Sequence, residues 1–189
     1  MVAVTDTIRV LGVSGSLQAT STNSALLRIA RDRAPVDVRV ELFDDLEHIP
    51  PFSPEIEPSP AAVAAFGGLV RAADGVLFAT PEYAHGLPGV LKNALDWLVG
   101  SGDLYGKRVV IMSAAPSRER GGHARADLER TLRAQGAVVL GSETVAVPSG
   151  VRGREADDPA IVAAVEIGLA LLSAQPAAAS GSGWQVGHQ

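Results

Sequence analysis

The chain has 189 residues, of which 47% are hydrophobic, which is enough for one core of ordinary size and short of what two independent domains need. Sixteen basic and 21 acidic residues give a formal charge of −5 with no lysine or arginine block, so no nucleic-acid partner is expected. The absence of cysteine excludes disulfides, thiolate metal sites and redox cycles on protein sulfur. Redox chemistry would therefore need a cofactor.

The two ends of the chain carry no targeting or membrane signal. The start, MVAVTDTIRV, lacks a basic segment followed by a long apolar stretch, and no run of about 18 apolar residues occurs in the chain. We therefore expect a cytoplasmic protein with no membrane partner. Residues 176–189 are small and polar without periodicity, so we expect a single domain over residues 1–175 followed by a flexible C-terminal tail.

Short runs of β-branched or alternating apolar residues, bounded by turn residues, predict strands at 8–13, 37–42, 75–79, 108–113 and 138–147. Helix-compatible stretches lie between and after them, at 23–33, 61–73, 88–99, 122–135 and 160–172. Alternating strands and helices imply parallel strands joined by right-handed crossovers, and hence a three-layer α/β/α sandwich. Such sheets bind ligands beyond the carboxyl ends of their strands, so the loops after the first, third and fourth strands are the candidate sites.

The loop after the first strand, residues 14–22, is rich in serine and threonine, and no lysine or arginine occurs between Arg9 and Arg28. Ser21 or Thr22 is a suitable N-cap for the helix that begins near Asn23. Hydroxyl groups, backbone N–H groups and the helix dipole together favour an anion. The loop therefore predicts a phosphate site that works without a cationic side chain.

The spacing of residues in this loop argues against three other interpretations. The third glycine of GxGxxG is missing, and no GxxxxGK[ST] phosphate loop occurs. The stretch GVSGS at 12–16 approaches the GxSxG hydrolase elbow around Ser14, but Ser16 takes the place of the last glycine. His123 also precedes the fifth strand, too early for the usual triad order. A capped helix with a small-residue turn and no ligand stays open.

The loop after the third strand leads into the next helix within the stretch TPEYAHGLPGVLKNALDWLVG, residues 80–100. Its prolines and glycines predict a rigid turn whose backbone groups stay free, with Pro88 suited to the first helical position. Tyr83 and Pro81 are placed to bracket the face of a flat heteroaromatic ring, whose polar atoms would bond the main chain.

At this point the sequence resembles the NADPH-dependent FMN reductase family, the flavodoxin-like group that includes quinone, azo-dye and chromate reductases. The family's phosphate loop usually reads GSLRxxSxN and its ring loop PEYNxxxPGxLKNALDW. This chain has GSLQ at 15–18 with Ser21 and Asn23, then PEYA at 81–84 and PGVLKNALDW at 88–97. The resemblance, from about residue 8 to 172, implies a five-stranded parallel sheet in the order 2-1-3-4-5 and a homodimer or homotetramer with flavin near the interface.

The resemblance also implies which residues bind the cofactors, FMN and NADPH. The first loop would surround the FMN phosphate, the second would lie along the isoalloxazine ring, and the third, SAAPSRERGG at 113–122, would close the ring's far side. No residue is expected to be catalytic, because the flavin supplies the redox step. The expected cofactor-binding residues are Ser14, Ser16, Gln18, Ser21, Thr22, Asn23, Pro81, Glu82, Tyr83, Ala84, His85, Gly86, Ser113 and Ser117.

Two positions depart from the family pattern. Gln18 replaces the usual arginine and so removes a charge-assisted phosphate contact, worth about 1.5–3 kcal/mol when well formed. Ala84 replaces the usual asparagine and removes a side-chain amide near the ring. We therefore predict weaker retention of FMN than in a typical member, with flavin behaving as a dissociable substrate.

Other residues near these motifs have more ordinary interpretations. His85 and His123 lack HExxH or paired-ligand spacing, so no metal site is expected. Arg118 and Arg120 belong either to a solvated face or to a contact with the phosphates of the nicotinamide cofactor. The helix predicted at 88–99 has an apolar arc of about 200°, wider than one sheet contact needs, and the spare face fits an oligomer interface.

We therefore expect an NAD(P)H-dependent FMN reductase that passes hydride from NADPH to FMN. Electrons would then go to a small-molecule acceptor: a quinone, an azo compound, a metal oxyanion or free flavin. The alternatives are a flavodoxin-type electron carrier without nicotinamide turnover, a serine hydrolase that uses Ser14, and a family member that has lost flavin and binds another ligand.

Overall fold

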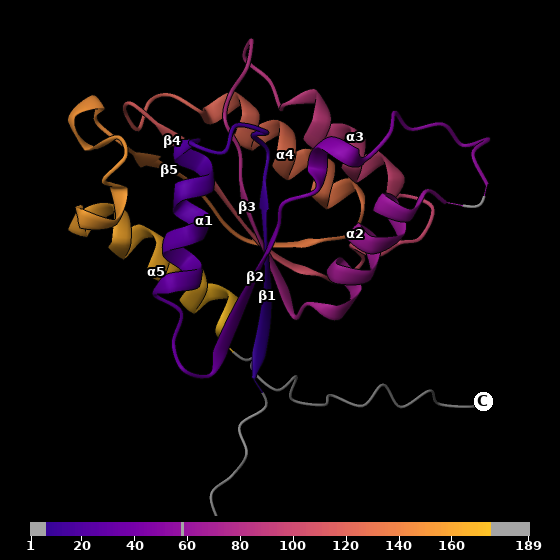
Figure 1. Ribbon diagram of the computed structural model, residues 1–189, viewed down its shortest axis with the longest axis horizontal. Coiled ribbons are helices and arrows are strands. Elements are labelled where there is room, and N and C mark those ends of the chain that lie inside the picture. Colours follow the sequence, from indigo (N-terminus) through magenta and orange to yellow (C-terminus); the bar gives the residue numbers. More distant parts are fainter. Residues whose placement is uncertain (1–6, 58, 175–189) are drawn as a thin grey trace, which may run out of the picture.

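The computed structural model describes residues 7–57 and 59–174, and in them one all-parallel sheet lies between two layers of helices (Figure 1). The observed strand order, β2-β1-β3-β4-β5, confirms the expected three-layer sandwich and its 2-1-3-4-5 topology. Residues 176–189, for which we expected a flexible tail, lie outside the described residues. The strands are β1 (Ile8–Ser14), β2 (Val38–Phe43), β3 (Gly75–Ala79), β4 (Arg108–Ala115) and β5 (Val138–Ala146).

The helices are α1 (Thr22–Asp32), α2 (Ala61–Ala72), α3 (Gly89–Trp97), α4 (Gly122–Ala134) and α5 (Pro159–Ser173). Every strand and helix boundary lies within two residues of its predicted position. One local detail is wrong: Pro88 is the N-cap of α3, with extended backbone at ψ 131, and is not the first helical residue. Three short 3₁₀ turns, η1 (Leu46–His48), η2 (Ser149–Val151) and η3 (Glu155–Asp157), were not predicted.

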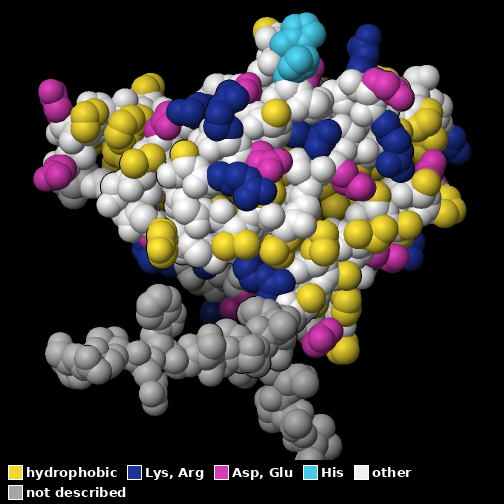
Figure 2. Space-filling model, turned by 180° about the vertical axis from the view of Figure 1, so that it is seen from behind, with side chains coloured by type: hydrophobic (Ala, Val, Ile, Leu, Met, Phe, Trp, Pro, Cys, Tyr) yellow, Lys and Arg dark blue, Asp and Glu magenta, His cyan; other side chains and the backbone are white. Residues whose placement is uncertain are grey.

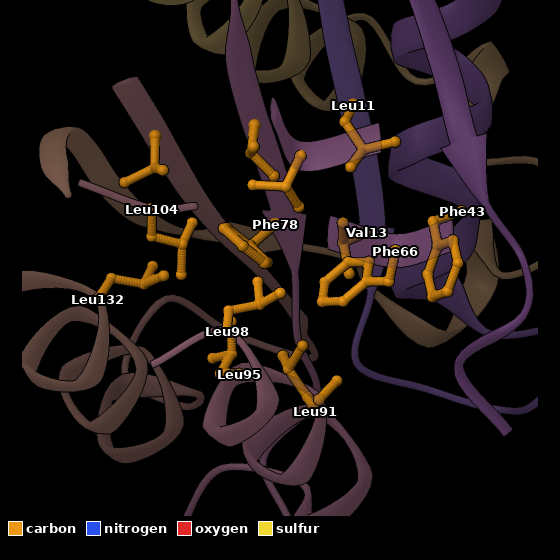
Figure 3. Packing of buried hydrophobic residues seen from close by; sticks show 14 of the residues in the cluster. Leu11, Val13, Phe43, Phe66, Phe78, Leu91, Leu95, Leu98, Leu104 and Leu132 are labelled. Carbon is orange, nitrogen blue, oxygen red and sulfur yellow. The ribbon is translucent and has the colours of Figure 1, made fainter. Parts of the chain in front are cut away.

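Alternation along the strands divides the core into two clusters, because successive side chains of a strand point to opposite faces of the sheet. Leu11 and Val13 of β1 face α2, α3 and α4, whereas Val10 faces α1 and α5. Figure 3 shows the first cluster, in which Phe66 of α2 lies beside Phe43 with ring centroids 4.7 Å apart. The sheet is thus buried on both faces, as parallel sheets require.

All five strands run in the same direction, so the loops that follow them meet at one edge of the sheet. This edge carries the segment between β1 and α1, the projecting loop between β3 and α3, and the segment between β4 and α4 (Figure 1). The segment from β5 to α5 reaches the same edge, where η3 packs against α1 (Figure 1). Within the described residues, none of the helices combines the length and apolar composition that a bilayer span needs.

Part of the spare apolar face of α3 is covered by the chain itself. The Trp97 indole Nε1 donates a hydrogen bond of 2.8 Å to the Pro50 carbonyl. The Phe52 ring meets the Trp97 ring edge to face at 5.1 Å. Val99, just beyond the helix, remains 61% exposed. The segment between β2 and α2 therefore takes up surface that the sequence analysis assigned to an oligomer interface, and oligomerisation stays a prediction.

Candidate functional site

A cleft of about 490 Å³ opens at the carboxyl edge of the sheet, between the loops that follow β1, β3, β4 and β5. Its volume is typical of small-molecule sites. The structure brings nine of the expected cofactor-binding residues together in its lining. They are Ser16, Gln18, Ser21, Thr22, Asn23, Pro81, Glu82, Tyr83 and Ser113.

The other five expected residues do not line the cleft: Ser14, Ala84, His85, Gly86 and Ser117. The Ser14 hydroxyl lies 2.9 Å from the Ser24 hydroxyl and accepts a bond from the Ser16 N–H, so it braces the loop from within. The Ser117 hydroxyl binds the Glu119 carboxylate and lowers the pKa of that carboxyl. Contact of these five residues with a cofactor stays a prediction.

The first loop is held in place by its own hydroxyls. Ser21 is the N-cap of α1, and its side chain accepts the Asn23 N–H at 3.2 Å. The Ser16 hydroxyl accepts the Gln18 N–H at 3.3 Å. The Gln18 amide in turn donates to the Thr20 hydroxyl at 3.2 Å. These contacts fix the loop around the N-terminus of α1, where the first-turn N–H groups and the helix dipole favour an anion.

Asn23 joins this loop to the opposite wall of the cleft. It is only 4% exposed, and its Oδ1 accepts the Ala114 N–H at 2.8 Å, at the end of β4. Gly15 brings the loop equally close to β3, because a Cβ there would lie 2.8 Å from the Thr80 hydroxyl. The phosphate-loop end of the cleft is therefore held against the ends of β3 and β4.

The loop after β3 is a tight hairpin. Tyr83 and Gly86 exchange backbone hydrogen bonds of 3.2 and 3.0 Å. The two residues between them, Ala84 and His85, both have left-handed backbone, with φ of 49° and 60°. Two-residue turns of this kind favour asparagine or glycine. The asparagine expected from the family pattern at position 84 therefore suits the turn itself, outside the cleft.

Glu82 connects this hairpin to α4. Its Oε2 accepts the N–H groups of His123 and Ala124 at 2.8 and 3.2 Å, so it caps a helix whose own N-cap, Gly121, has no side chain to do so. The His85 and His123 rings meet edge to face at 5.0 Å. Figure 2 shows histidine side chains projecting at the top of the molecule. Within the described part of the chain, no group of three or more His, Cys, Asp or Glu side chains is arranged to hold a metal ion.

The wall formed by the loop after β4 contains a polar atom that lacks a protein partner. Ser113 is one of the residues that line the cleft and is 1% exposed, and its buried Oγ has no hydrogen bond to any described residue. Gly121 lies over it with φ of 80°, and a Cβ there would come within 2.5 Å of this oxygen. Buried hydroxyls are nearly always bonded. The Ser113 hydroxyl thus fits a ligand with polar atoms, such as a flavin.

The segment after β5 adds lining residues that the sequence analysis missed, Arg152, Gly153 and Glu155. Glu155 is 7% exposed, and its Oε1 accepts the Gly153 N–H at 3.0 Å. Arg120, whose role was left open, lines the cleft as well. These residues could have been found from the sequence, because ligands bind beyond the carboxyl ends of parallel strands and the segment after the fifth strand begins at such an end.

A parallel sheet in the order 2-1-3-4-5 with its cleft at the β1/β3 reversal of strand order defines a flavodoxin-like protein. The chain belongs to the NADPH-dependent FMN reductase family, whose model matches residues 8–152. This confirms the resemblance seen in the sequence. The protein is thus a flavin-dependent oxidoreductase, of a family that uses FMN and NAD(P)H.

Among curated proteins, the chain is 40% identical over 133 residues to an NAD(P)H-dependent FMN reductase of Pseudomonas aeruginosa, a match that covers 68% of this chain and 71% of that one. It is 34% identical over 117 residues to a quinone reductase of Escherichia coli, covering 59% of this chain and 62% of the relative. Both relatives are named as reductases.

Solved structures agree on the fold. A flavoenzyme NAD(P)H:(acceptor) oxidoreductase from Paracoccus denitrificans superposes with a TM-score of 0.75 at 22% identity, over 87% of this chain and 97% of that one. The general stress protein 14 of Treponema denticola, solved in complex with FMN, has a TM-score of 0.55 at 16% identity, over the same shares of the two chains. At these identities the likeness concerns the fold alone.

Proposed function

We propose that the cleft holds FMN and that the protein is an NAD(P)H-dependent FMN reductase that passes electrons to a small acceptor. The observation that carries this proposal is the buried, unpartnered hydroxyl of Ser113, a residue in the lining of a cleft that begins at the N-terminus of α1. A flavin nucleotide has an anion at one end and a ring with polar edge atoms at the other. The two ends of the cleft offer the matching groups.

Each wall then has a separate task. The hydroxyls of Ser16, Ser21 and Thr22, with the first-turn N–H groups of α1, would bind the phosphate. The backbone of the segment 81–83 would lie along the ring edge, and Ser113 would bond a polar atom of the ring or of the ribityl chain. Asn23 keeps these two regions at a fixed separation through its bond to Ala114.

When bound, FMN would supply the redox chemistry by accepting hydride from reduced nicotinamide and passing electrons on. The chain's own residues have the task of orienting the ring and leaving one face open. Tyr83 stands at the rim of the cleft with 57% of its surface exposed, so it is available to cover a second flat ligand. No side chain in the cleft is needed as an acid or base for hydride transfer.

Quinones are the acceptor class that we favour, since one relative described above is named a quinone reductase. The ring of a quinone would occupy the open side of the cleft beside Tyr83. Azo compounds, metal oxyanions and free flavin are the other acceptors to compare. Turnover of reduced nicotinamide with a panel of the four classes ranks them directly.

The decisive test is a titration of the purified protein with FMN, followed by anaerobic addition of NADPH. Loss of the flavin absorbance bands on addition of NADPH is the expected result. Bands that persist would instead indicate an electron carrier without nicotinamide turnover. Failure to bind FMN would contradict the proposal altogether.

We further propose that the protein acts as a homo-oligomer in the cytoplasm. The exposed Val99 beside α3 supports an interface on this helix, and the need for reduced nicotinamide favours a cytoplasmic location. Sedimentation velocity of the protein with and without FMN tests the oligomer. A monomer in both conditions would contradict it.

A further inference from the structure

The phosphate-loop end of the cleft has no cation from its own loop. The Gln18 side chain, at the position where the family pattern has arginine, is turned onto the Thr20 hydroxyl at 3.2 Å. Arg28 of α1 lies nearby, but its Nη1 donates to the Ala19 carbonyl at 3.3 Å and it does not line the cleft. A phosphate dianion held by N–H groups and hydroxyls alone would forgo a charge-assisted bond.

Two arginines from other elements do line the cleft, and they stand at different places in it. Arg120 belongs to the wall after β4, where its carbonyl accepts the Thr144 hydroxyl at 2.9 Å, next to Gly121 over Ser113. Arg152 belongs to the segment between β5 and α5, whose η3 turn packs against α1 (Figure 1). Arg152 therefore comes from the side of the phosphate loop, and Arg120 from the side of the Ser113 wall.

The neighbours of Arg152 confirm this placement. Gly153 and Glu155 line the cleft together with Arg152. They also line an adjoining cavity of about 430 Å³, whose other wall includes Ala19 and Thr20 of the phosphate loop. The backbone beside Arg152 thus lines the same cavity as residues 19–20.

The backbone that carries Arg152 is fixed, whereas its side chain has no partner within the described residues. Val151 bonds back to the Pro148 carbonyl at 2.9 Å, and the buried Glu155 holds the Gly153 N–H. The next arginine, Arg154, differs: its guanidinium donates to the Gly150 carbonyl at 3.1 Å and lies outside the cleft lining. An unpaired guanidinium on a held backbone is suited to bind a phosphate.

We propose that Arg152 supplies the charged contact to the FMN phosphate that Gln18 does not provide. The charged contact would then come from the segment after β5 and not from the loop after β1. Retention of FMN then depends on Arg152, which replaces the expectation of weak retention drawn from Gln18 alone. This inference rests on the proposed binding of FMN in the cleft.

The test compares FMN with riboflavin, which has the same ring and ribityl chain but no phosphate. Arg152→Gln should raise the dissociation constant for FMN by about 10- to 100-fold, the range of one charge-assisted hydrogen bond, and leave that for riboflavin unchanged. Arg154→Gln is the matched control and should change neither constant. Adding Gln18→Arg to Arg152→Gln should restore most of the affinity for FMN. Flavin fluorescence quenching measures all four proteins.

Two results would overturn the inference about Arg152, and a third would overturn the proposed function itself. If wild-type protein binds FMN and bleaches with NADPH, but Arg152→Gln leaves the affinities for both FMN and riboflavin unchanged, Arg152 does not bind the phosphate. If Arg152→Gln weakens FMN and riboflavin equally, its effect is on the fold of the cleft, which a lowered melting temperature would reveal. If the wild-type protein binds neither flavin, the proposed function itself fails.

Discussion

At the scale of single residues, two adjacent glycines show how local backbone controls the cleft. Gly121 has φ of 80° and would place a Cβ 2.5 Å from the Ser113 hydroxyl, whereas a Cβ on Gly122 would meet nothing within 4 Å. Gly121→Ala should lower the free energy of unfolding by about 1–3 kcal/mol, through strain and displacement of Ser113. It should also weaken FMN binding. Gly122→Ala, the control, should leave both quantities nearly unchanged in urea denaturation and FMN titration.

Ala84 is a second residue at which the backbone conformation matters, because it is unfavourable for alanine. Its φ of 49° in the hairpin turn after Tyr83 costs an alanine energy that asparagine avoids. Ala84→Asn should therefore raise the free energy of unfolding by about 0.5–1 kcal/mol. The same substitution at Ala160, which is exposed in the first turn of α5, should not raise the free energy of unfolding. Equal effects at both positions in urea denaturation would contradict the strain argument.

At the scale of elements, the sequence predicted every strand and helix because the periodicities of 2 and 3.6 depend on burial alone. The positions of Gly15 and Ser21 could also be predicted, because a small-residue turn and a helix N-cap are local sequence signals. The role of Arg152 could not, because it depends on how η3 packs against α1, which are far apart in the sequence. The close approach of Gly121 to Ser113, eight residues earlier in the chain, likewise depends on how the folded segments pack.

The connection between the β3–α3 hairpin and α4 is also a property of elements, and it depends on one carboxylate. Glu82 accepts two N–H groups at the N-terminus of α4, where its charge also favours the helix dipole. Glu82→Ala should lower the free energy of unfolding by about 0.5–2 kcal/mol, the range of a lost N-cap. FMN affinity should fall too, because the hairpin carries Tyr83. Glu47→Ala, which removes an exposed carboxylate outside the cap and the cleft lining, is the control for both measurements.

At the scale of the whole molecule, the cleft exists only when the sheet is complete. Its lining comes from the segments after β1, β3, β4 and β5, and these strands are neighbours in one sheet. Asn23 joins two of those segments by a single hydrogen bond to Ala114. A ligand held by all four segments therefore recognises the folded chain and has no equivalent site in the unfolded one.

This dependence predicts how strongly FMN stabilises the protein. With free FMN held at 100 times its dissociation constant, binding to the folded state alone adds about 2.7 kcal/mol. For a chain of this size that amount should raise the melting temperature by about 5–11 °C. Riboflavin at 100 times its own dissociation constant should give the same shift, since only the ratio of concentration to dissociation constant enters. A much smaller shift in differential scanning fluorimetry would mean that FMN also binds the unfolded chain or that the cleft unfolds before the sheet, against the structure described above.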